Sequence, residues 1–340
     1  MSGERDITIY DIAKKLNISA ATVSRGLKDH PGISDATKKR IKDTAAELGY
    51  RFNTFASNLR RQRTNTIGVI VPRLNSSFMS DVIAGIERIA NEEAYNLIIS
   101  QSLERVKKES QNAATMFNSR VDGLLVSLAY NTESIAHFEK FMEKDIPLIF
   151  FDRVFAHEKC PRIVIDNYKA GYEATQHLIE QGCRRILHIT GSQQQNVYKD
   201  RHQGYYDALI NNELPVLEEL TIVNNLDHDA GIAAATSILT MPIKPDGVFV
   251  ANDTCAVACM IELRKNGISI PDEIAFVGFN NDPLSKVVEP NLSTINYHGE
   301  EMGELAAKVL IAKLSGSDNL NAFHHLLKHE LIVRESSLRK

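Results

Sequence analysis

The sequence predicts two kinds of fold in one chain: an all-α helix-turn-helix headpiece, and an α/β core of two doubly wound parallel-sheet subdomains. The first 50 residues carry apolar positions at helical spacing, interrupted by turn and cap residues. From Thr66 onward, runs that are apolar throughout alternate with helical segments, which is typical of parallel strands buried on both faces. The same alternation restarts after Asn167 and therefore indicates a second α/β unit.

Three short helices are predicted in the headpiece. The first spans residues 10–16 and has one apolar stripe. Asn17 ends it, because Asn tolerates a left-handed turn, and Ser19 caps the second helix, which follows. A third helix begins after Ser34 and stops at Gly49. Periodicity alone also fits any small helical bundle, so the interpretation needs further support.

Charge supplies part of that support. The first 63 residues hold 13 Lys and Arg against 7 Asp and Glu, although the whole chain has a net charge of −4. Neutralisation of phosphates dominates the affinity of proteins for nucleic acids. A basic segment joined to an acidic body is therefore typical of a DNA-binding arm on a domain with another role.

Four sequence words then resemble the headpiece of LacI/GalR-type repressors. They are Ile9-Tyr10-Asp11-Ile12-Ala13, Ala21-Thr22-Val23-Ser24-Arg25, Ser34-Asp35-Ala36-Thr37 and Ala46-Glu47-Leu48-Gly49-Tyr50. Residues 51–59 look like the hinge of that family, and the resemblance continues through most of the chain. It implies a sequence-specific DNA-binding regulator, in the first place a repressor, that binds a near-palindromic operator as a homodimer.

Candidate DNA-binding residues come from the second helix, its neighbours and the hinge. Ala20, Ala21 and Arg25 should face base edges, because small side chains allow close approach and Arg binds a guanine edge. The resemblance implies that Leu59 wedges into a base step and that Ala56 lets the hinge helix approach the minor groove. The full set is Ala20, Ala21, Thr22, Ser24, Arg25, Thr37, Tyr50, Asn53, Ala56 and Leu59.

The resemblance also implies a core like a periplasmic sugar-binding protein, in which three crossovers join two subdomains and the ligand lies between them. The predicted limits are 1–52 for the headpiece, 53–65 for the hinge helix or linker, 66–165 with 296–326 for the N-terminal core subdomain, and 166–295 with 327–340 for the C-terminal core subdomain.

Polar residues directly after the strands predict an effector cleft, because open parallel sheets bind ligands beyond the carboxyl ends of their strands. For any single residue a turn or cap explains the pattern equally well. Together, the carboxylates, amides and arginines suit a hydroxylated ligand such as a sugar or nucleoside, with Phe78 to stack on it. The candidates are Asn75, Ser76, Phe78, Ser127, Asp152, Arg153, Arg201, Asn252, Asp253 and Asn280.

Switching requires that the effector bind the DNA-competent and incompetent states differently. If Arg201 reaches the ligand from one subdomain and Asp152 or Ser127 from the other, only a closed cleft satisfies both. The alternative for Arg201 is a surface ion pair with Asp200 or Asp207. Arg201→Ala is then expected to abolish switching but to change ligand-free DNA binding by only about a few tenths of a kcal/mol, as a surface substitution would.

Other functions find less support in the sequence. It contains no Gly-x-Gly-x-x-Gly, no phosphate-binding Gly-Lys-Ser/Thr loop and no Gly-x-Ser-x-Gly elbow, so no enzyme, catalytic residue or cofactor is predicted. The four cysteines are scattered and the histidines lack zinc spacing, so no metal is predicted. The alternatives are a cytoplasmic sugar- or nucleoside-binding protein, or an α/β enzyme without a DNA role.

No apolar run has the length of a membrane span, and the N-terminus lacks the layout of a signal peptide. A cytoplasmic, nucleoid-associated regulator of carbohydrate metabolism without a membrane partner is expected. Without a terminal leucine heptad, a dimer is expected rather than a tetramer. The residues leave open which effector acts, whether it induces or co-represses, and which operator is bound.

Overall fold

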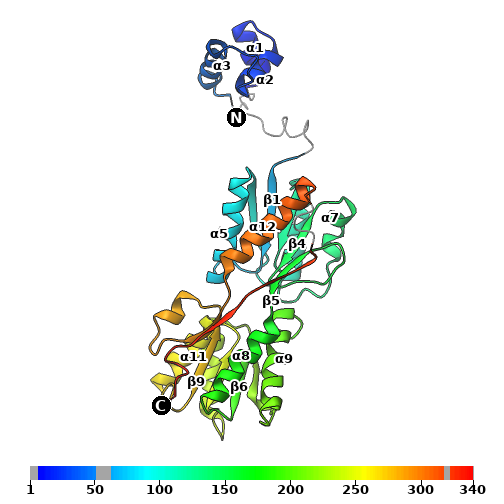
Figure 1. Cartoon of the computed structure of the whole chain (residues 1–340). Coiled ribbons are helices and arrows are strands. Elements are labelled where there is room, and N and C mark those ends of the chain that lie inside the picture. Colours follow the sequence, from blue (N-terminus) through cyan, green and yellow to red (C-terminus); the bar gives the residue numbers. More distant parts are fainter. Residues whose placement is uncertain (1–6, 51–62, 318–321, 340) are drawn as a thin grey trace. The chain divides into compact units, whose positions relative to one another are not determined.

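The computed structural model describes residues 7–50, 63–317 and 322–339. The chain divides into two compact units, residues 1–64 and 65–340 (Figure 1). Three of the predicted DNA-binding residues, Asn53, Ala56 and Leu59, lie outside the described residues.

Among the described residues of the first unit there are three helices, as predicted for the headpiece. They are α1 (Ile9–Leu16), α2 (Ala20–Leu27) and α3 (Asp35–Glu47). One side chain from each helix, Ile12, Val23 and Ile41, is fully buried in the shared core. Asn17 adopts the left-handed conformation that ends α1, with φ of 53°. Ser19 then caps α2 by accepting a hydrogen bond from an N–H group of its first turn.

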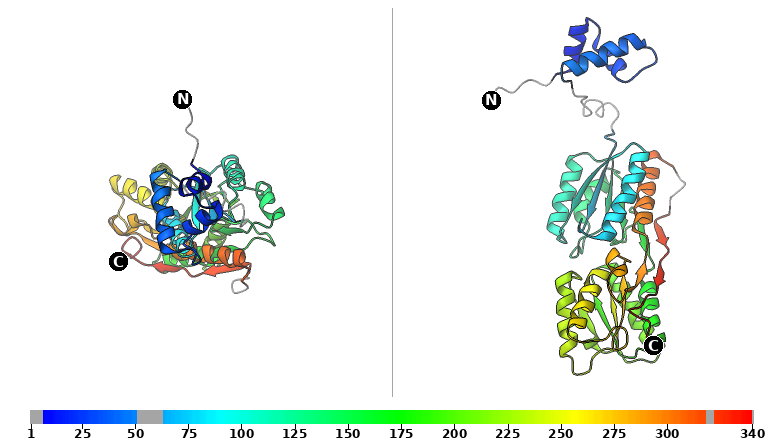
Figure 2. Two further views of the ribbon diagram at one scale, coloured as in Figure 1. Left: turned by 90° about the horizontal axis from the view of Figure 1, so that it is seen from above. Right: turned by 90° about the vertical axis from the view of Figure 1, so that its left-hand side faces the viewer.

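The first sheet of the core is parallel and has the strand order β11-β5-β4-β3-β1-β2. Its strands are β1 (Thr66–Val71), β2 (Asn96–Gln101), β3 (Gly123–Val126), β4 (Leu148–Phe151), β5 (Arg162–Ile165) and β11 (His324–Leu327). The helices of this subdomain are α5 (Ser77–Glu92), α6 (Val106–Asn118), α7 (Glu139–Glu143) and α12 (Gly299–Ser315), with the short 3-10 turn η1 (Ala136–Phe138). Figure 2 shows helices on both faces of the sheet.

The second sheet has the order β12-β10-β9-β8-β6-β7, and only β12 runs antiparallel to its neighbour. Its strands are β6 (Ile186–Thr190), β7 (Thr221–Val223), β8 (Gly247–Val250), β9 (Ala275–Phe279), β10 (Ser293–Asn296) and β12 (Glu330–Ile332). The helices are α8 (Asn167–Glu180), α9 (Asn196–Asn211), α10 (His228–Thr240) and α11 (Asp253–Lys265), with 3-10 turns η2 (Glu218–Leu220) and η3 (Pro283–Lys286). Two doubly wound subdomains are thus confirmed.

The chain crosses between the sheets after β5, after β10 and after β11. The sequence-based limits are displaced by one residue at two of these crossings. Asn296 pairs with Glu330 and therefore belongs to the second sheet, whereas Leu327 pairs with Ile165 and belongs to the first. A strand ends where its backbone stops pairing with the neighbouring strand, and composition does not reveal that position.

Close packing of α8 against α9 positions Arg201, which lies on α9. The backbones of α8 and α9 touch at Gly171, where an added Cβ would overlap the carbonyl oxygen of Arg201. Gly204 has the same role one turn later, because a Cβ there would overlap the carbonyl oxygen of Tyr168. These two glycines allow the contact that presses α9 against α8 beside the second sheet.

Candidate functional site

On the headpiece, the outward side of α2 is small and polar. Ala21 and Arg25 are exposed, whereas Ala20, Thr22 and Ser24 are half-buried. The buried stripe of the same helix is made by Val23 and Gly26. The face that remains open to a partner is therefore a set of small side chains beside one guanidinium, all on one helix.

Four of the predicted DNA-binding residues contact their own unit, and one of them, Ala20, packs against the headpiece core. The hydroxyls of Thr22 and Ser19 lie 2.8 Å apart, and those of Thr37 and Ser34 lie 2.9 Å apart. Tyr50 is half-buried and packs against the headpiece core. These contacts support the local fold, and they leave the two threonine hydroxyls close to helix N-termini, where backbone N–H groups favour an anion.

In the core, the structure brings together the loop after β4 and the start of α9. Asn196 donates through Nδ2 to the carbonyl oxygen of Asp152 at 3.1 Å. It also accepts the backbone N–H of Val154 at 3.0 Å. Through Asn196 the second subdomain thus holds the segment that carries Asp152 and Arg153.

Arg201 is 3% exposed, so the predicted alternative of a surface ion pair is wrong. Its Nε donates to Asn167 Oδ1 at 2.9 Å, and its Nη1 donates to the carbonyl oxygen of Ala251 at 3.0 Å. The guanidinium carbon lies 3.5 Å from the ring centroid of Phe279. Asp207, one of the proposed surface partners, instead accepts the hydroxyl of Tyr168 at 3.0 Å. Burial also overturns the idea that Arg201→Ala is a surface change.

Arg153 is buried between charged and aromatic partners. It donates to Glu104 Oε2 at 2.7 Å and to the Tyr198 hydroxyl at 3.0 Å. The Tyr198 ring also lies 5.4 Å from the guanidinium carbon of Arg153 and 5.8 Å from that of Arg201. One tyrosine of the second subdomain therefore stands close to arginines from both subdomains.

Asp152 faces these arginines. It has a left-handed backbone with φ of 57° and is 7% exposed. Burial raises the pKa of its carboxyl, and Arg153 and Arg201 oppose that shift without cancelling it. Ser127, which directly follows β3, is also fully buried, and its Oγ has no hydrogen-bond partner among the described residues.

Aromatic rings line the same region. The ring centroids of Phe78 and Tyr297 lie 4.5 Å apart, and those of Phe279 and Tyr297 lie 5.6 Å apart. Burial raises the pKa of Tyr297 well above its ordinary value, with Asp152 adding to the shift and Arg201 opposing it. Phe78 is on α5 of the first subdomain and Phe279 ends β9 of the second, so the rings connect the two subdomains.

Two predicted residues after β8 have internal partners instead. Asp253 is fully buried, and its two oxygens accept the Asp282 backbone N–H and the Thr294 hydroxyl, each at 2.8 Å. Burial, then Asp282, raises the pKa of Asp253. Asn252 caps α11 by accepting the Cys255 N–H at 3.2 Å. At Asn252, a helix cap therefore accounts for the polar residue after the strand, which is the alternative given above for any single candidate.

The remaining predicted residues lie apart from the arginines or beside their loops. Ser76 caps α5. Asn75 is exposed and lines a surface hollow together with Arg73 and Gln101. Asn280 has φ of 111° and hydrogen-bonds the Asp282 carboxyl, which makes it a loop residue of the second subdomain.

Several residues of this region are missed by reading only strand ends. Tyr198 is one helical turn before Arg201, and Tyr297 follows β10 at a crossover. Helical spacing from Arg201 could have indicated Tyr198. Glu104 and Asn167 give no such signal, because each reaches its arginine through tertiary packing.

Further contacts join the two subdomains at the rim of this region. Gln195 is 2% exposed, and its amide donates to the carbonyl oxygens of Ala129 and Tyr130 at 3.0 and 3.2 Å. The Tyr130 hydroxyl donates to the Asn224 carbonyl oxygen at 3.2 Å. We call the buried cluster of Asp152, Arg153, Tyr198, Arg201 and Tyr297 the cleft, after the effector cleft that the sequence predicts here.

Within the described residues, no group of three or more His, Cys, Asp or Glu side chains could hold a metal ion. Over the same ranges, no helix has both the length and the apolar character needed to cross a membrane. The four cysteines are free and buried.

Comparison with known proteins gives two domain matches. Residues 8–53 match the description "Bacterial regulatory proteins, lacI family", and residues 175–337 match a periplasmic binding protein-like domain. The transcriptional regulator RegA of Clostridium saccharobutylicum is 31% identical over 97% of this chain and 99% of its own length.

Solved structures agree on the fold. A complex of the transcriptional regulator CelR with cellobiose has a TM-score of 0.74 and 26% identity, over 97% of this chain and 99% of that one. A Lac repressor dimer bound to its operator has a TM-score of 0.84 and 22% identity, over 98% of this chain and 100% of that one.

Proposed function

This chain belongs to the lacI family of bacterial regulatory proteins, and on that premise we propose that it is an effector-controlled repressor whose core cleft binds a small hydroxylated molecule. It regulates transcription through DNA, and repression without catalysis is part of this proposal. A protein that binds chromosomal DNA acts in the cytoplasm, at the nucleoid. The domain limits given above, with Asn296 and Leu327 reassigned, are proposed as its functional divisions.

For the DNA side, Ala20, Ala21 and Arg25 are proposed to face base edges. Thr22, Ser24, Thr37 and Tyr50 are proposed to hold phosphates or the headpiece itself, and the resemblance assigns Asn53, Ala56 and Leu59 to the hinge. A single headpiece offers few contacts, so two copies on a near-palindromic operator are required for tight binding.

A homodimer is supported by apolar side chains that remain exposed in the single chain. Ile98 and Ile99 lie on the edge strand β2 and are 36% and 39% exposed. On the second subdomain, Leu284 and Val287 at η3 are 45% and 75% exposed. Exposed apolar residues next to an unpaired strand edge favour association with another chain. Light scattering should give twice the mass of the chain.

For the effector side, the observation that carries the proposal is the buried convergence of Asp152 and Arg153 from one subdomain with Tyr198 and Arg201 from the other. Such groups supply acceptors, donors and a ring to stack on, which suits a sugar or nucleoside. The cellobiose complex of CelR, at 26% identity, supports a sugar. Asn75, Ser76, Asn252 and Asp253 are proposed only as supports of the surrounding loops, and Phe78, Ser127 and Asn280 as residues of its wall.

Control of DNA binding would follow from cleft closure. A ligand that bridges groups of both subdomains binds the closed state better, and only that difference can shift the balance of states. The hydrogen bonds of Gln195 across the rim support this proposal, because they already join the two subdomains there.

The test is a thermal-shift screen of the purified protein against sugars, sugar acids, sugar phosphates and nucleosides, followed by operator binding with each ligand that stabilises it. A ligand at 100 times its Kd should stabilise the native state by about 2.7 kcal/mol. The proposed cleft is wrong if a stabilising ligand acts equally on Arg153→Ala and wild-type protein. Selection of an operator from random DNA tests the headpiece separately.

A further inference from the structure

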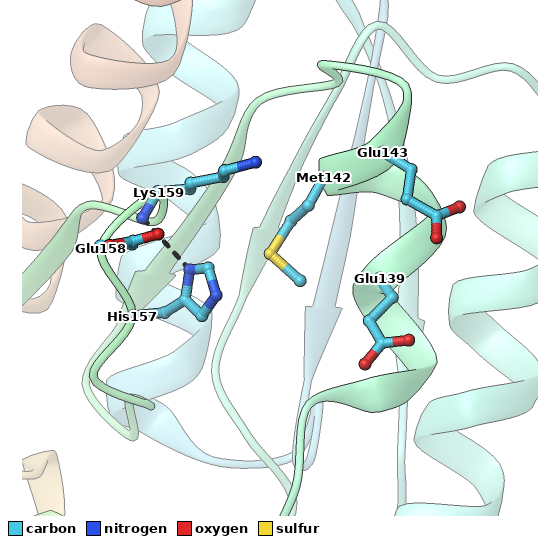
Figure 3. A pocket seen from close by; sticks show the side chains of 6 residues that line it. All are labelled: Glu139, Met142, Glu143, His157, Glu158 and Lys159. Atoms are coloured by element: carbon cyan, nitrogen blue, oxygen red, sulfur yellow. Dashed lines mark hydrogen bonds between the residues drawn. The ribbon is translucent and has the colours of Figure 1, made fainter.

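Three side chains with donor atoms suited to soft metals meet beside α7. The Sγ atom of Cys160 lies 3.7 Å from Met142 Sδ and 3.8 Å from His157 Nδ1. Figure 3 shows the adjoining hollow, with the Met142 side chain pointing toward the His157 ring. Neither the DNA-binding face nor the cleft uses these residues.

The backbone sets two of the three donors. His157 and Cys160 are the first and fourth residues of a tight turn, in which the Cys160 N–H donates to the His157 carbonyl oxygen at 3.2 Å. The backbone N–H of Lys159 donates to His157 Nδ1 at 3.1 Å, drawn as the dashed line in Figure 3. A neutral ring that accepts at Nδ1 carries its proton on Nε2, which is the form that binds a metal through Nδ1. Binding would exchange the Lys159 bond for the metal.

The spacing fits one shared ion. Metal bonds of about 2.3 Å to sulfur and about 2.0 Å to imidazole nitrogen, at tetrahedral to trigonal angles, separate the donor atoms by about 3.5 to 4.0 Å. Within it, two sulfur atoms should lie about 3.8 to 4.0 Å apart, and a sulfur and a nitrogen about 3.5 to 3.7 Å apart. The measured separations from the Cys160 sulfur, 3.7 Å to Met142 Sδ and 3.8 Å to His157 Nδ1, each lie within about 0.1 Å of the interval for their pair. The adjustment that Met142 and His157, both half-buried, need relative to the Cys160 sulfur is therefore small.

Donor type selects the ion. A thiolate with a thioether selects Cu(I) over harder cations, and imidazole also suits copper. Two exposed carboxylates on α7, Glu139 and Glu143, line the hollow and give it negative charge (Figure 3). Burial raises the pKa of Cys160 to about 11, so the thiol is protonated at neutral pH. Binding replaces the S–H bond by a sulfur–metal bond and releases one proton to solvent, without any change of oxidation state.

We propose that Cys160, Met142 and His157 form a binding site for one soft monovalent cation, Cu(I), on the loop that begins with Asp152 and Arg153. The site stands independently of the proposed effector cleft. Since Met142 is on α7 and the turn belongs to the β4–β5 loop, a bound ion would tie these two segments together.

The experiment is an anaerobic Cu(I) titration of the reduced full chain against the chromophoric chelator bicinchoninate, with Ag(I) in native mass spectrometry as a redox-inert probe. Wild-type protein should withdraw one Cu(I) per chain from the chelator. Cys160→Ser should abolish this withdrawal, and Met142→Leu and His157→Asn should each weaken it by roughly ten-fold or more.

Cys183→Ser is the matched control. Cys183 is an equally buried thiol, and burial raises its pKa to about 11 as well, but its sulfur hydrogen-bonds the Asp246 carbonyl oxygen and Arg339 instead of lying beside a methionine and a histidine. It should bind Cu(I) like wild type. The proposal is overturned if wild-type protein withdraws no Cu(I), if Cys160→Ser or both other variants bind normally, or if Cys183→Ser loses binding. Circular dichroism checks whether Cys160→Ser folds. If it does not fold, Met142→Leu and His157→Asn decide the test, because they change only half-buried side chains.

Discussion

The outward face of α2 and the cleft place their arginines in opposite environments. Arg25 is exposed on an eight-residue helix, whereas Arg201 is 3% exposed and bonded to two other segments. An exposed arginine can be changed with little effect on stability, but a buried one is part of the fold. Substitutions on the outward face of α2 should therefore change DNA binding without changing stability, whereas substitutions in the cleft should change effector binding and stability together.

The largest expected effect tests the buried side. Arg201→Ala leaves the Asn167 side chain and the Ala251 carbonyl oxygen without their donor, which should lower the free energy of unfolding by about 2 to 4 kcal/mol and abolish any effector response. Urea unfolding measures the first effect. The control is Lys199→Ala, an exposed cation on the same helix. If both variants unfold at the same urea concentration, the contrast between the two arginines is lost.

A pH experiment sharpens the same point at a carboxylate near the cleft. Burial, together with repulsion from Asp81, raises the pKa of Asp282 from 3.8 to about 6, although a hydrogen bond from Asn280 opposes the shift. The folded state then holds this proton more tightly than the unfolded state, so its contribution to stability falls as pH rises from about 4 to 6 and stays low above that.

Asp282→Asn should remove this cost, which is at most about 3 kcal/mol above pH 6. Compared with wild type, the variant should gain stability between pH 4 and pH 6 in a series of urea unfolding curves. Asp43→Asn on the exposed side of α3 serves as the control for removal of one charge. A difference between Asp282→Asn and wild type that stays constant from pH 4 to pH 7 would contradict the burial argument.

On the exposed side, Arg25→Ala should weaken operator binding by about 1 to 3 kcal/mol while leaving the unfolding curve unchanged, if Arg25 binds a guanine edge. Fluorescence anisotropy with operator and random duplexes measures this. Lys39→Ala, which removes an exposed cation from α3, should weaken both duplexes alike. An equal loss on both duplexes for Arg25→Ala would make it a phosphate contact.

The smallest effect concerns the rim. Gln195→Ala removes two hydrogen bonds between the subdomains and should cost about 1 kcal/mol of stability, with a larger radius of gyration in solution scattering. Gln194→Ala is the control, because that exposed amide makes one cross-subdomain bond, to Glu133 at 2.8 Å. If both variants lose the same stability and have the same radius of gyration, burial does not decide how strongly these hydrogen bonds hold the two subdomains together.

The sequence by itself determined those features that depend on neighbours along the chain. Helical spacing, the caps at Ser19 and Ser34 and the left-handed turn at Asn17 are local, so the three-helix headpiece followed from the sequence. Buried apolar runs alternating with helices likewise predicted two parallel-sheet subdomains, because a strand covered on both faces must be apolar throughout.

Tertiary structure alone decided which polar residues share a site. Asp152 and Asp253 both follow buried strands, yet one faces two arginines and the other bonds the adjacent loop and strand. For Arg201 the sequence left open an effector contact or a surface ion pair, because only the packing of α9 on α8 shows which side of the helix is buried. Partners such as Glu104 for Arg153, or Met142 for Cys160, are separated along the chain and meet only through the packing of whole elements. Local physics fixes helices and strands, but the energy of a buried charge depends on distant groups that only the folded chain brings within reach.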